Sequence, residues 1–101
     1  MWLFAMFDLP VDTKKARKRY TQFRKALLRD GFSMLQYSVY ARYCASQEAA
    51  VVYRQRIRAV LPPEGYIRLL AVTDRQFGRM ENYVGKTRRG AEKSPTQLTL
   101  F

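Results

Sequence analysis

The sequence contains no histidine, so the side chain most often used as a catalytic base is missing. Catalytic triads with a histidine base, imidazole zinc sites and imidazole acid–base nuclease chemistry are therefore excluded. Cys44 is the only cysteine, which also excludes an internal disulfide and every multi-cysteine metal site. Catalysis by this chain has to use carboxylates, hydroxyls, cations or a bound hard metal ion.

Acidic residues are scarce as well: 8 Asp and Glu stand against 19 Lys and Arg, a formal net charge of +11. A charge of this size exceeds what solubility requires and attracts polyanions. No apolar stretch is long enough to span a bilayer, and the apolar start at residues 1–7 lacks the basic segment of a signal peptide. We therefore expect a cytosolic protein that binds nucleic acid rather than a membrane.

The chain of 101 residues, 48% of them apolar, suits a single domain with one layer of helices on one sheet. Residues 1–7 form a short apolar run that ends at Asp8, which predicts a central strand buried on both faces. Asp12 or Thr13 is expected to cap a helix that runs to about Arg29. Apolar side chains recur along one side of this helix at helical spacing: Ala16, Tyr20, Phe23 and Leu27.

Residues 32–44 alternate in polarity and are rich in aromatic and branched side chains, which predicts two strands with a break near Tyr37 and Ser38. Ser46 is expected to cap a second helix, which the proline pair after Leu61 ends. The stripe of this helix expected to face the core consists of Ala49, Val52, Tyr53, Ile57, Val60 and Leu61.

Residues 66–73 predict a further strand, followed by a short helical turn that Asp74 would cap. The resulting order, βαββαβ, is typical of an α+β ferredoxin-like sandwich with an antiparallel sheet and two helices on one face. We expect residues 1–84 to form this domain and residues 85–101 to form a basic linker and a C-terminal strand.

The C-terminal part of the chain changes character after Gly85. Up to Pro95 it has the composition of a mobile basic connector, and residues 97–101 then return to the alternation of a strand. A strand after a linker needs a sheet edge to pair with. Because so short a chain buries a modest fraction of its surface, we expect a homodimer in which this strand docks on the partner's sheet.

The first predicted helix has a wholly cationic polar side, with no acid before Asp30. Its basic residues are Lys14, Lys15, Arg17, Lys18, Arg19, Arg24, Lys25 and Arg29. A solvated face, the alternative interpretation, normally mixes both signs because like charges four residues apart repel. We therefore interpret the side as a binding surface for phosphate backbone, which it would position without reading sequence. Most Tyr and Phe fall at core positions by periodicity, which favours packing over base stacking.

Asp8 is the most informative single residue. A carboxylate that ends a buried strand just before a helix lies where phosphates and metal ions often meet, although a turn-forming aspartate is the alternative. Two copies of Asp8 about a two-fold axis would repel each other, which favours a shared proton or a bridging cation that also holds a phosphate. Ser38 could then orient water or phosphate, the alternative being an ordinary hydrogen-bonding serine of a strand pair.

Several short motifs occur in a characteristic order: Met-Phe-Asp-Leu-Pro at 6–10, Arg-Lys-Arg-Tyr at 17–20, Gly-Phe at 31–32 and Gln-Tyr-Ser-Val-Tyr at 36–40. Together they resemble the family of CRISPR-associated protein two, and the resemblance covers nearly the whole chain. The segment at 70–77 is similar to the version of the family found beside a type II effector nuclease.

This resemblance implies a ferredoxin-like homodimer that sits between two dimers of the CRISPR integrase subunit and holds a double-stranded DNA prespacer during spacer acquisition. It also implies an Mg²⁺-dependent endonuclease acting on RNA or DNA, with Asp8 as metal ligand and catalytic residue at the dimer axis. The arginine pair of the family's first helix corresponds to Arg17 and Arg19, and its strand serine to Ser38. One departure is Phe7, where many members have tyrosine, so a hydroxyl next to the aspartate is lost.

Two other functions stay open at this point. One is a stand-alone, toxin-like metal-dependent endoribonuclease, as in the virulence-associated protein D family. The other is a non-catalytic RNA-binding module, and a ribosomal protein would fit the charge equally well. The RNA-recognition signature of Lys or Arg followed by Gly, an aromatic residue, Gly or Ala and a second aromatic residue is absent, which disfavours base reading on the sheet.

Overall fold

The computed structural model describes residues 1–92; the strand expected at residues 97–101 lies outside them. In chain order the elements are β1 (Trp2–Asp8), α1 (Lys14–Arg29), β2 (Ser33–Gln36), β3 (Val39–Tyr43), α2 (Gln47–Arg58), β4 (Tyr66–Val72), α3 (Asp74–Gly78), β5 (Asn82–Val84) and β6 (Thr87–Arg89). The predicted βαββαβ order is confirmed, as is the strand break at Tyr37 and Ser38.

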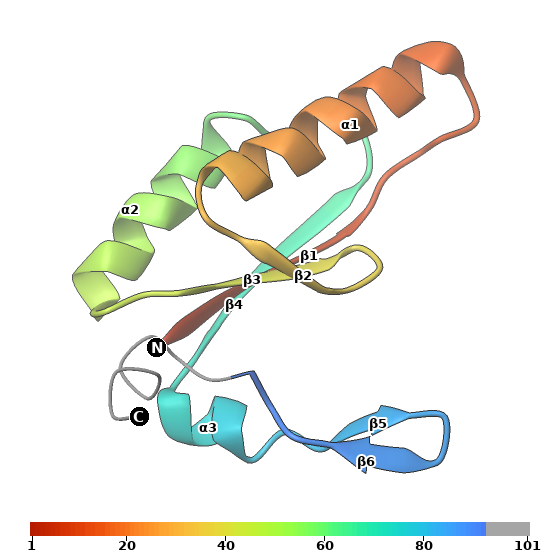
Figure 1. Cartoon of the computed structure of the whole chain (residues 1–101). Helices are drawn as coiled ribbons and strands as arrows, with labels where there is room; N and C mark the ends of the chain where they lie inside the picture. Colours follow the sequence, from red (N-terminus) through yellow and green to blue (C-terminus); the bar gives the residue numbers. More distant parts are fainter. Residues whose placement is uncertain (93–101) are drawn as a thin grey trace.

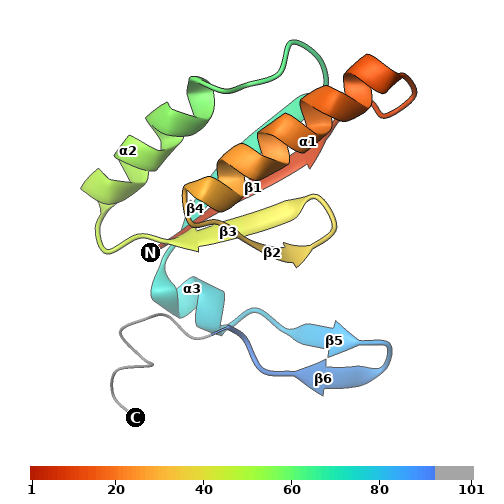
Figure 2. The same cartoon turned by 45° about the horizontal axis from the view of Figure 1, so that its top comes forward.

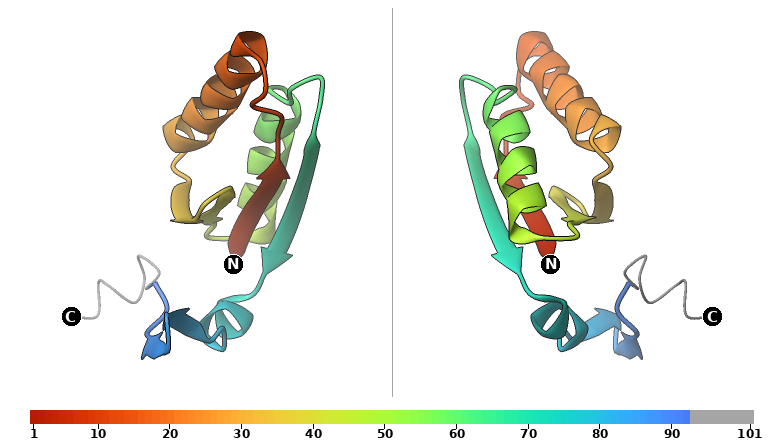
Figure 3. Two further views of the ribbon diagram at one scale, coloured as in Figure 1. Left: turned by 90° about the vertical axis from the view of Figure 1, so that its right-hand side faces the viewer. Right: turned by 90° about the vertical axis from the view of Figure 1, so that its left-hand side faces the viewer.

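The first four strands form one antiparallel sheet in the order β2-β3-β1-β4. Helices α1 and α2 lie side by side on one face of this sheet (Figures 1 and 3). The arrangement is the ferredoxin-like α+β sandwich that the sequence predicts. Within residues 1–92, none of the helices combines the length and the apolarity needed to cross a membrane.

Strand β1 lies between β3 and β4 and is buried on both faces, as its apolar run predicts. Successive side chains of a strand point to opposite faces. Leu3, Ala5 and Phe7 therefore belong to the core beneath the two long helices. Trp2 and Phe4 point to the other face, where Phe77 of α3 stacks on Trp2 with a centroid separation of 4.1 Å.

Helix α1 begins where its capping residue predicts. The Thr13 side chain accepts a hydrogen bond from the Ala16 backbone N–H at 3.0 Å, so Thr13 rather than Asp12 is the cap. Ala16, Phe23 and Leu27 are buried, and most of the remaining helix surface is polar.

Helix α2 confirms part of the predicted stripe, because Ile57 is buried in the core and Ala49 and Tyr53 pack against it. Ala50 and Ile57 are its buried residues, whereas Val52 is 50% exposed. The helix also ends at Arg58, so Val60 and Leu61 lie beyond it and are exposed as well. The early end follows from the proline pair, because a residue before proline is disfavoured in helical conformation. Apolar side chains surround this helix, so periodicity identified its inner face only in part.

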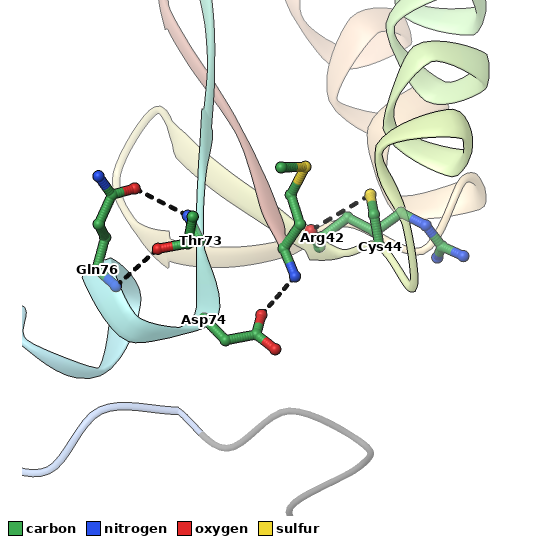
Figure 4. A network of polar contacts seen from close by, with 6 residues as sticks. Arg42, Cys44, Thr73, Asp74 and Gln76 are labelled. Atoms are coloured by element: carbon green, nitrogen blue, oxygen red, sulfur yellow. Dashed lines mark hydrogen bonds and ion pairs between the residues drawn. The ribbon is translucent and has the colours of Figure 1, made fainter.

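Two expectations for the C-terminal half are wrong. Thr73, not Asp74, caps α3: its side chain accepts from the Gln76 N–H while the Gln76 side chain accepts from the Thr73 N–H (Figure 4). Residues 82–89 form a β-hairpin separate from the four-stranded sheet (Figure 2), so the connector expected from Gly85 to Pro95 begins with a strand pair. Its two-residue turn needs positive φ, which Gly85 supplies at 59°. The hairpin crosses the expected domain boundary at residue 84, and that division stays a prediction.

Candidate nucleic-acid interface

Asp8 is the last residue of β1 and is exposed. Its strand neighbours place it on the face of the sheet opposite to the long helices, because Leu3, Ala5 and Phe7 point toward the helices. Tyr66 lies directly opposite Asp8 in the register of β1 and β4. No ion pair within residues 1–92 involves the Asp8 carboxylate, so its charge is free to act on a ligand.

The turn between β2 and β3 lies beside this carboxylate. Ser38 accepts a hydrogen bond from the Phe7 N–H on its carbonyl oxygen at 3.1 Å, which attaches the turn to the end of β1. The φ of Ser38, 62°, is in the left-handed region, which residues other than glycine rarely adopt. Such conformations cluster at functional sites. The structure thus brings Ser38 and Asp8 together.

The side chain of Phe7 points away from Asp8. It is buried in the helix-covered core, where it packs edge-on against Phe23 with a centroid separation of 5.2 Å and stacks near Tyr40. A tyrosine hydroxyl at this position would therefore enter the core rather than the surroundings of the Asp8 carboxylate. This corrects the expectation that Phe7 removes a hydrogen bond from the aspartate.

A metal ion at Asp8 would need ligands from outside a single chain. Among the described residues, no three His, Cys, Asp or Glu side chains are grouped closely enough to hold one. Mg²⁺ usually keeps several waters and binds through one or two carboxylates together with substrate phosphates. One Asp8 carboxylate, or one from each of two copies, fits this pattern when phosphate oxygens and water supply the remaining ligands.

The cationic residues of α1 lie at the surface. Of those predicted to bind nucleic acid, Arg19 is half-buried and the others are exposed: Lys14, Lys15, Arg17, Lys18 and Arg24. The Arg24 Nε donates to the Tyr40 hydroxyl at 2.9 Å, and Arg17 donates to the Val11 carbonyl at 3.1 Å. Within residues 1–92, none of these cations pairs with a carboxylate.

The first turn of α1 concentrates positive charge. It contains Lys14 and Lys15 but no acid, although the free N–H groups and the dipole of a helix N-terminus already favour an anion. The repulsion is uncompensated within the described part of the chain, and a phosphate group would relieve it. Residues 9–13 alone connect the end of β1 to this cationic turn.

The arginines of α2 contribute less free charge. Arg56 donates to the Asp30 carboxylate at 2.6 Å, and this hydrogen bond raises the pKa of the guanidinium. The pair connects the C-terminal end of α1 to α2. Arg54 is half-buried, and Arg58 is exposed.

Sequence reasoning missed two features of the site. Gly65, with φ of 95°, packs so closely against β1 that a Cβ atom would lie 2.6 Å from Leu9 Cδ2. Tyr37 and Tyr66 are exposed and line the same depression as Asp8, whereas sequence periodicity assigned most aromatic residues to the core. The glycine in the loop before β4 is compatible with a turn of positive φ. Its contact with Leu9 cannot be read from the sequence, because the two residues are far apart along the chain.

Together these features define a ferredoxin-like α+β protein whose cationic helix follows a strand that ends in an exposed carboxylate. A family model described as CRISPR associated protein Cas2 matches residues 1–80. The chain belongs to this family, which confirms the resemblance seen in the motifs.

Individual relatives agree with this assignment. A protein of Parvibaculum lavamentivorans named CRISPR-associated endoribonuclease Cas2 is 59% identical over 101 residues, which cover 100% of both chains. One of the same name from Flavobacterium psychrophilum is 50% identical, over 100% of this chain and 88% of the relative. The crystal structure of Streptococcus pyogenes Cas2 at pH 6.5 has the same fold, with a TM-score of 0.62 and 22% identity over 83% of this chain and 100% of that chain.

Proposed function

We propose that this chain acts in CRISPR spacer acquisition as a homodimeric scaffold that binds double-stranded DNA and carries an Mg²⁺-dependent endonuclease centre at Asp8. The observation that carries the proposal is the surface of α1, where every charged residue is cationic and none pairs with a carboxylate of the described chain. Phosphate backbone is the ligand that removes this repulsion, and it is bound in this way without regard to sequence.

Helix α3 covers only part of the sheet face opposite to the long helices, and the uncovered part supports the homodimer. Leu70 lies opposite Phe4 in the register of β1 and β4 and is 50% exposed. Met6, two residues further along β1, is on the same face and is only partly buried. A second copy packed on this face would bury these side chains and bring two Asp8 carboxylates toward a common axis.

The names of the relatives and the exposure of Asp8 support the endonuclease centre. An Mg²⁺ ion held by two Asp8 carboxylates and phosphate oxygens would polarise the scissile phosphate and lower the pKa of a bound water. The chain's own residues would hold the strand: α1 cations would bind phosphates next to the centre, and Ser38 would orient water or a phosphate oxygen. The relatives are named endoribonucleases, so RNA is a second substrate to test beside DNA.

The direct test is reconstitution with a CRISPR integrase subunit and a short DNA duplex. We expect a defined complex of dimers by light scattering, together with insertion of the duplex into repeat DNA. Replacing Arg17 and Arg19 by alanine should abolish the duplex-bound complex while the dimer of this chain persists. A chain that is strictly monomeric and does not bind duplexes even in dilute buffer would contradict the proposal.

A further inference from the structure

Strand β4 carries an unpaired cation, Arg68, on the face of the sheet opposite to the long helices. Arg68 lies opposite Met6 in the register of β1 and β4, and Tyr66 lies opposite Asp8. Because successive side chains of a strand alternate between faces, Arg68 and Asp8 lie on the same face and are diagonal neighbours. Arg68 is exposed, and no ion pair within residues 1–92 involves its guanidinium group.

Arg68 and Asp8 also line the same shallow depression at the end of β1. The other residues that line it are uncharged, and Met6, Val39 and Tyr66 supply apolar surface. A long side chain can reach a diagonal neighbour across two paired strands. The depression therefore contains one cation and one carboxylate in surroundings that are otherwise without charge.

Burial of this depression would make the two charges depend on each other. The proposed homodimer covers this face of the sheet and takes Arg68 and Asp8 out of water. A charge that leaves water is costly unless an opposite charge pairs with it. Two Asp8 carboxylates near a common axis would in addition repel each other. Two Arg68 guanidinium groups, one from each copy, would offset both carboxylates, so that the four groups together have no net charge.

We propose that Arg68 is the counter-charge of Asp8 in the homodimer, where it removes the repulsion between the two carboxylates and lets the copies associate without a metal ion. The inference rests on the proposed homodimer and adds the group that neutralises its centre. Arg68 is thus a positioning residue, because a guanidinium group can donate two parallel hydrogen bonds to a carboxylate and fix its orientation. Mg²⁺ is then not needed to assemble the dimer.

Phosphate is the other partner that an exposed arginine could bind. In that case, removal of Arg68 would lower duplex affinity and leave the dimer unchanged. Asp8 is the better partner because it is a diagonal neighbour of Arg68 and lines the same depression. The Asp8 carboxylate would also repel a phosphate group that approached the guanidinium.

The test measures the dissociation constant of the dimer by analytical ultracentrifugation, with either a chelator or Mg²⁺ in the buffer. In chelator, Arg68→Met should weaken the dimer by roughly 100-fold, because it leaves buried carboxylates without a counter-charge. Arg68→Lys should retain most of the association, since the positive charge is kept. The control is Arg58→Met, which removes the same charge from α2 and should leave the dimer unchanged.

A second substitution identifies the group on which Arg68 acts. In the Arg68→Met background, Asp8→Asn should restore association nearly to the parent level, because the unpaired charge is removed. Asp12→Asn makes the same charge change at an exposed carboxylate of the neighbouring loop and should restore nothing. Mg²⁺ should partly restore the dimer of Arg68→Met, because a bridging cation takes the place of the guanidinium group.

The results distinguish a wrong counter-charge from a wrong homodimer. An Arg68→Met variant that dimerises like the parent protein in chelator would overturn the counter-charge and leave the homodimer intact. Failure of Asp8→Asn to restore this variant would overturn it as well, and so would a loss of duplex affinity at an unchanged dimer dissociation constant. A parent protein that stays monomeric at every concentration would contradict the proposed homodimer itself.

Discussion

Gly65 lies directly against the backbone of Asp8, where a methyl group on Gly65 would stand 2.7 Å from the Asp8 carbonyl oxygen. The loop before β4 can approach the end of β1 this closely only because residue 65 has no side chain and adopts φ of 95°. Gly65 is therefore a positioning residue for the carboxylate, although it supplies no functional group.

We expect Gly65→Ala to destabilise the fold by about 1–3 kcal/mol and to displace Asp8, because the added methyl group overlaps backbone atoms. Gly85→Ala is the control: Gly85 also has positive φ, at 59°, but a Cβ atom there would meet nothing within 4 Å. The control variant should lose about 1 kcal/mol of folding stability through backbone strain, and its cleavage activity should be unchanged. Equal reductions of cleavage in the two variants, at matched stability, would contradict a positioning role for Gly65.

Asp8→Asn should abolish Mg²⁺-dependent cleavage, with a decrease of roughly 100-fold or more, because an amide is a poor ligand for a hard cation. Duplex binding should be retained or slightly strengthened, since one repulsive charge is removed. The control is Asp12→Asn, which makes the same charge change at an exposed carboxylate of the neighbouring loop. Cleavage that persists both in Asp8→Asn and in the presence of a chelator would show that Asp8 is not the centre.

Substitutions of Ser38 separate its hydroxyl from its backbone conformation. Ser38→Gly relieves the positive φ of 62°, whereas Ser38→Ala keeps it, so the glycine variant should be more stable than the alanine variant by about 1 kcal/mol in urea unfolding. Both variants lack the hydroxyl and should lose cleavage to the same extent if it orients water or phosphate. Full cleavage by either variant would show that the Ser38 hydroxyl has no role in the reaction.

Cys44 should behave as an inert core residue. It is 1% exposed, and burial raises the pKa of its thiol although Arg42 and the N-terminal amine act in the opposite direction. A thiol reagent should label the native protein at least roughly tenfold more slowly than the urea-unfolded chain. Because the raised pKa disfavours the native thiolate, this group's contribution to stability is complete below about pH 8.5 and declines at higher pH. Equal labelling rates would contradict its burial.

Local signals predicted the elements well. Thr13 and Ser46 cap the two long helices because their hydroxyls reach the backbone three residues on, a relationship that is visible in sequence. The face of α2 was predicted in part: Ile57 is buried as expected, but valines surround that helix, and only packing on the sheet selects Ala50 over Val52. The turn at Gly85 was missed because the basic residues around it resemble a linker.

The candidate site was predicted less completely than the fold. Asp8 and the cations of α1 follow from charge and strand position, and their roles stay predictions. The contact of Gly65 with Asp8 depends on tertiary structure, because it joins the segment before β4 to the end of β1. The exposure of Tyr66 depends on which face of the sheet the helices cover, which alternation alone leaves undecided.

The central claim is that the cationic surface of α1 binds phosphate backbone, and the salt dependence of duplex binding tests it most directly. Arg17→Ala and Arg19→Ala should each lower affinity several-fold and reduce the slope of log K against log salt by about 0.9 for each phosphate that the variant no longer binds. Arg75→Ala, which removes the same charge from α3, should leave the slope unchanged. Unaltered affinity and slope in both α1 variants would contradict the claim.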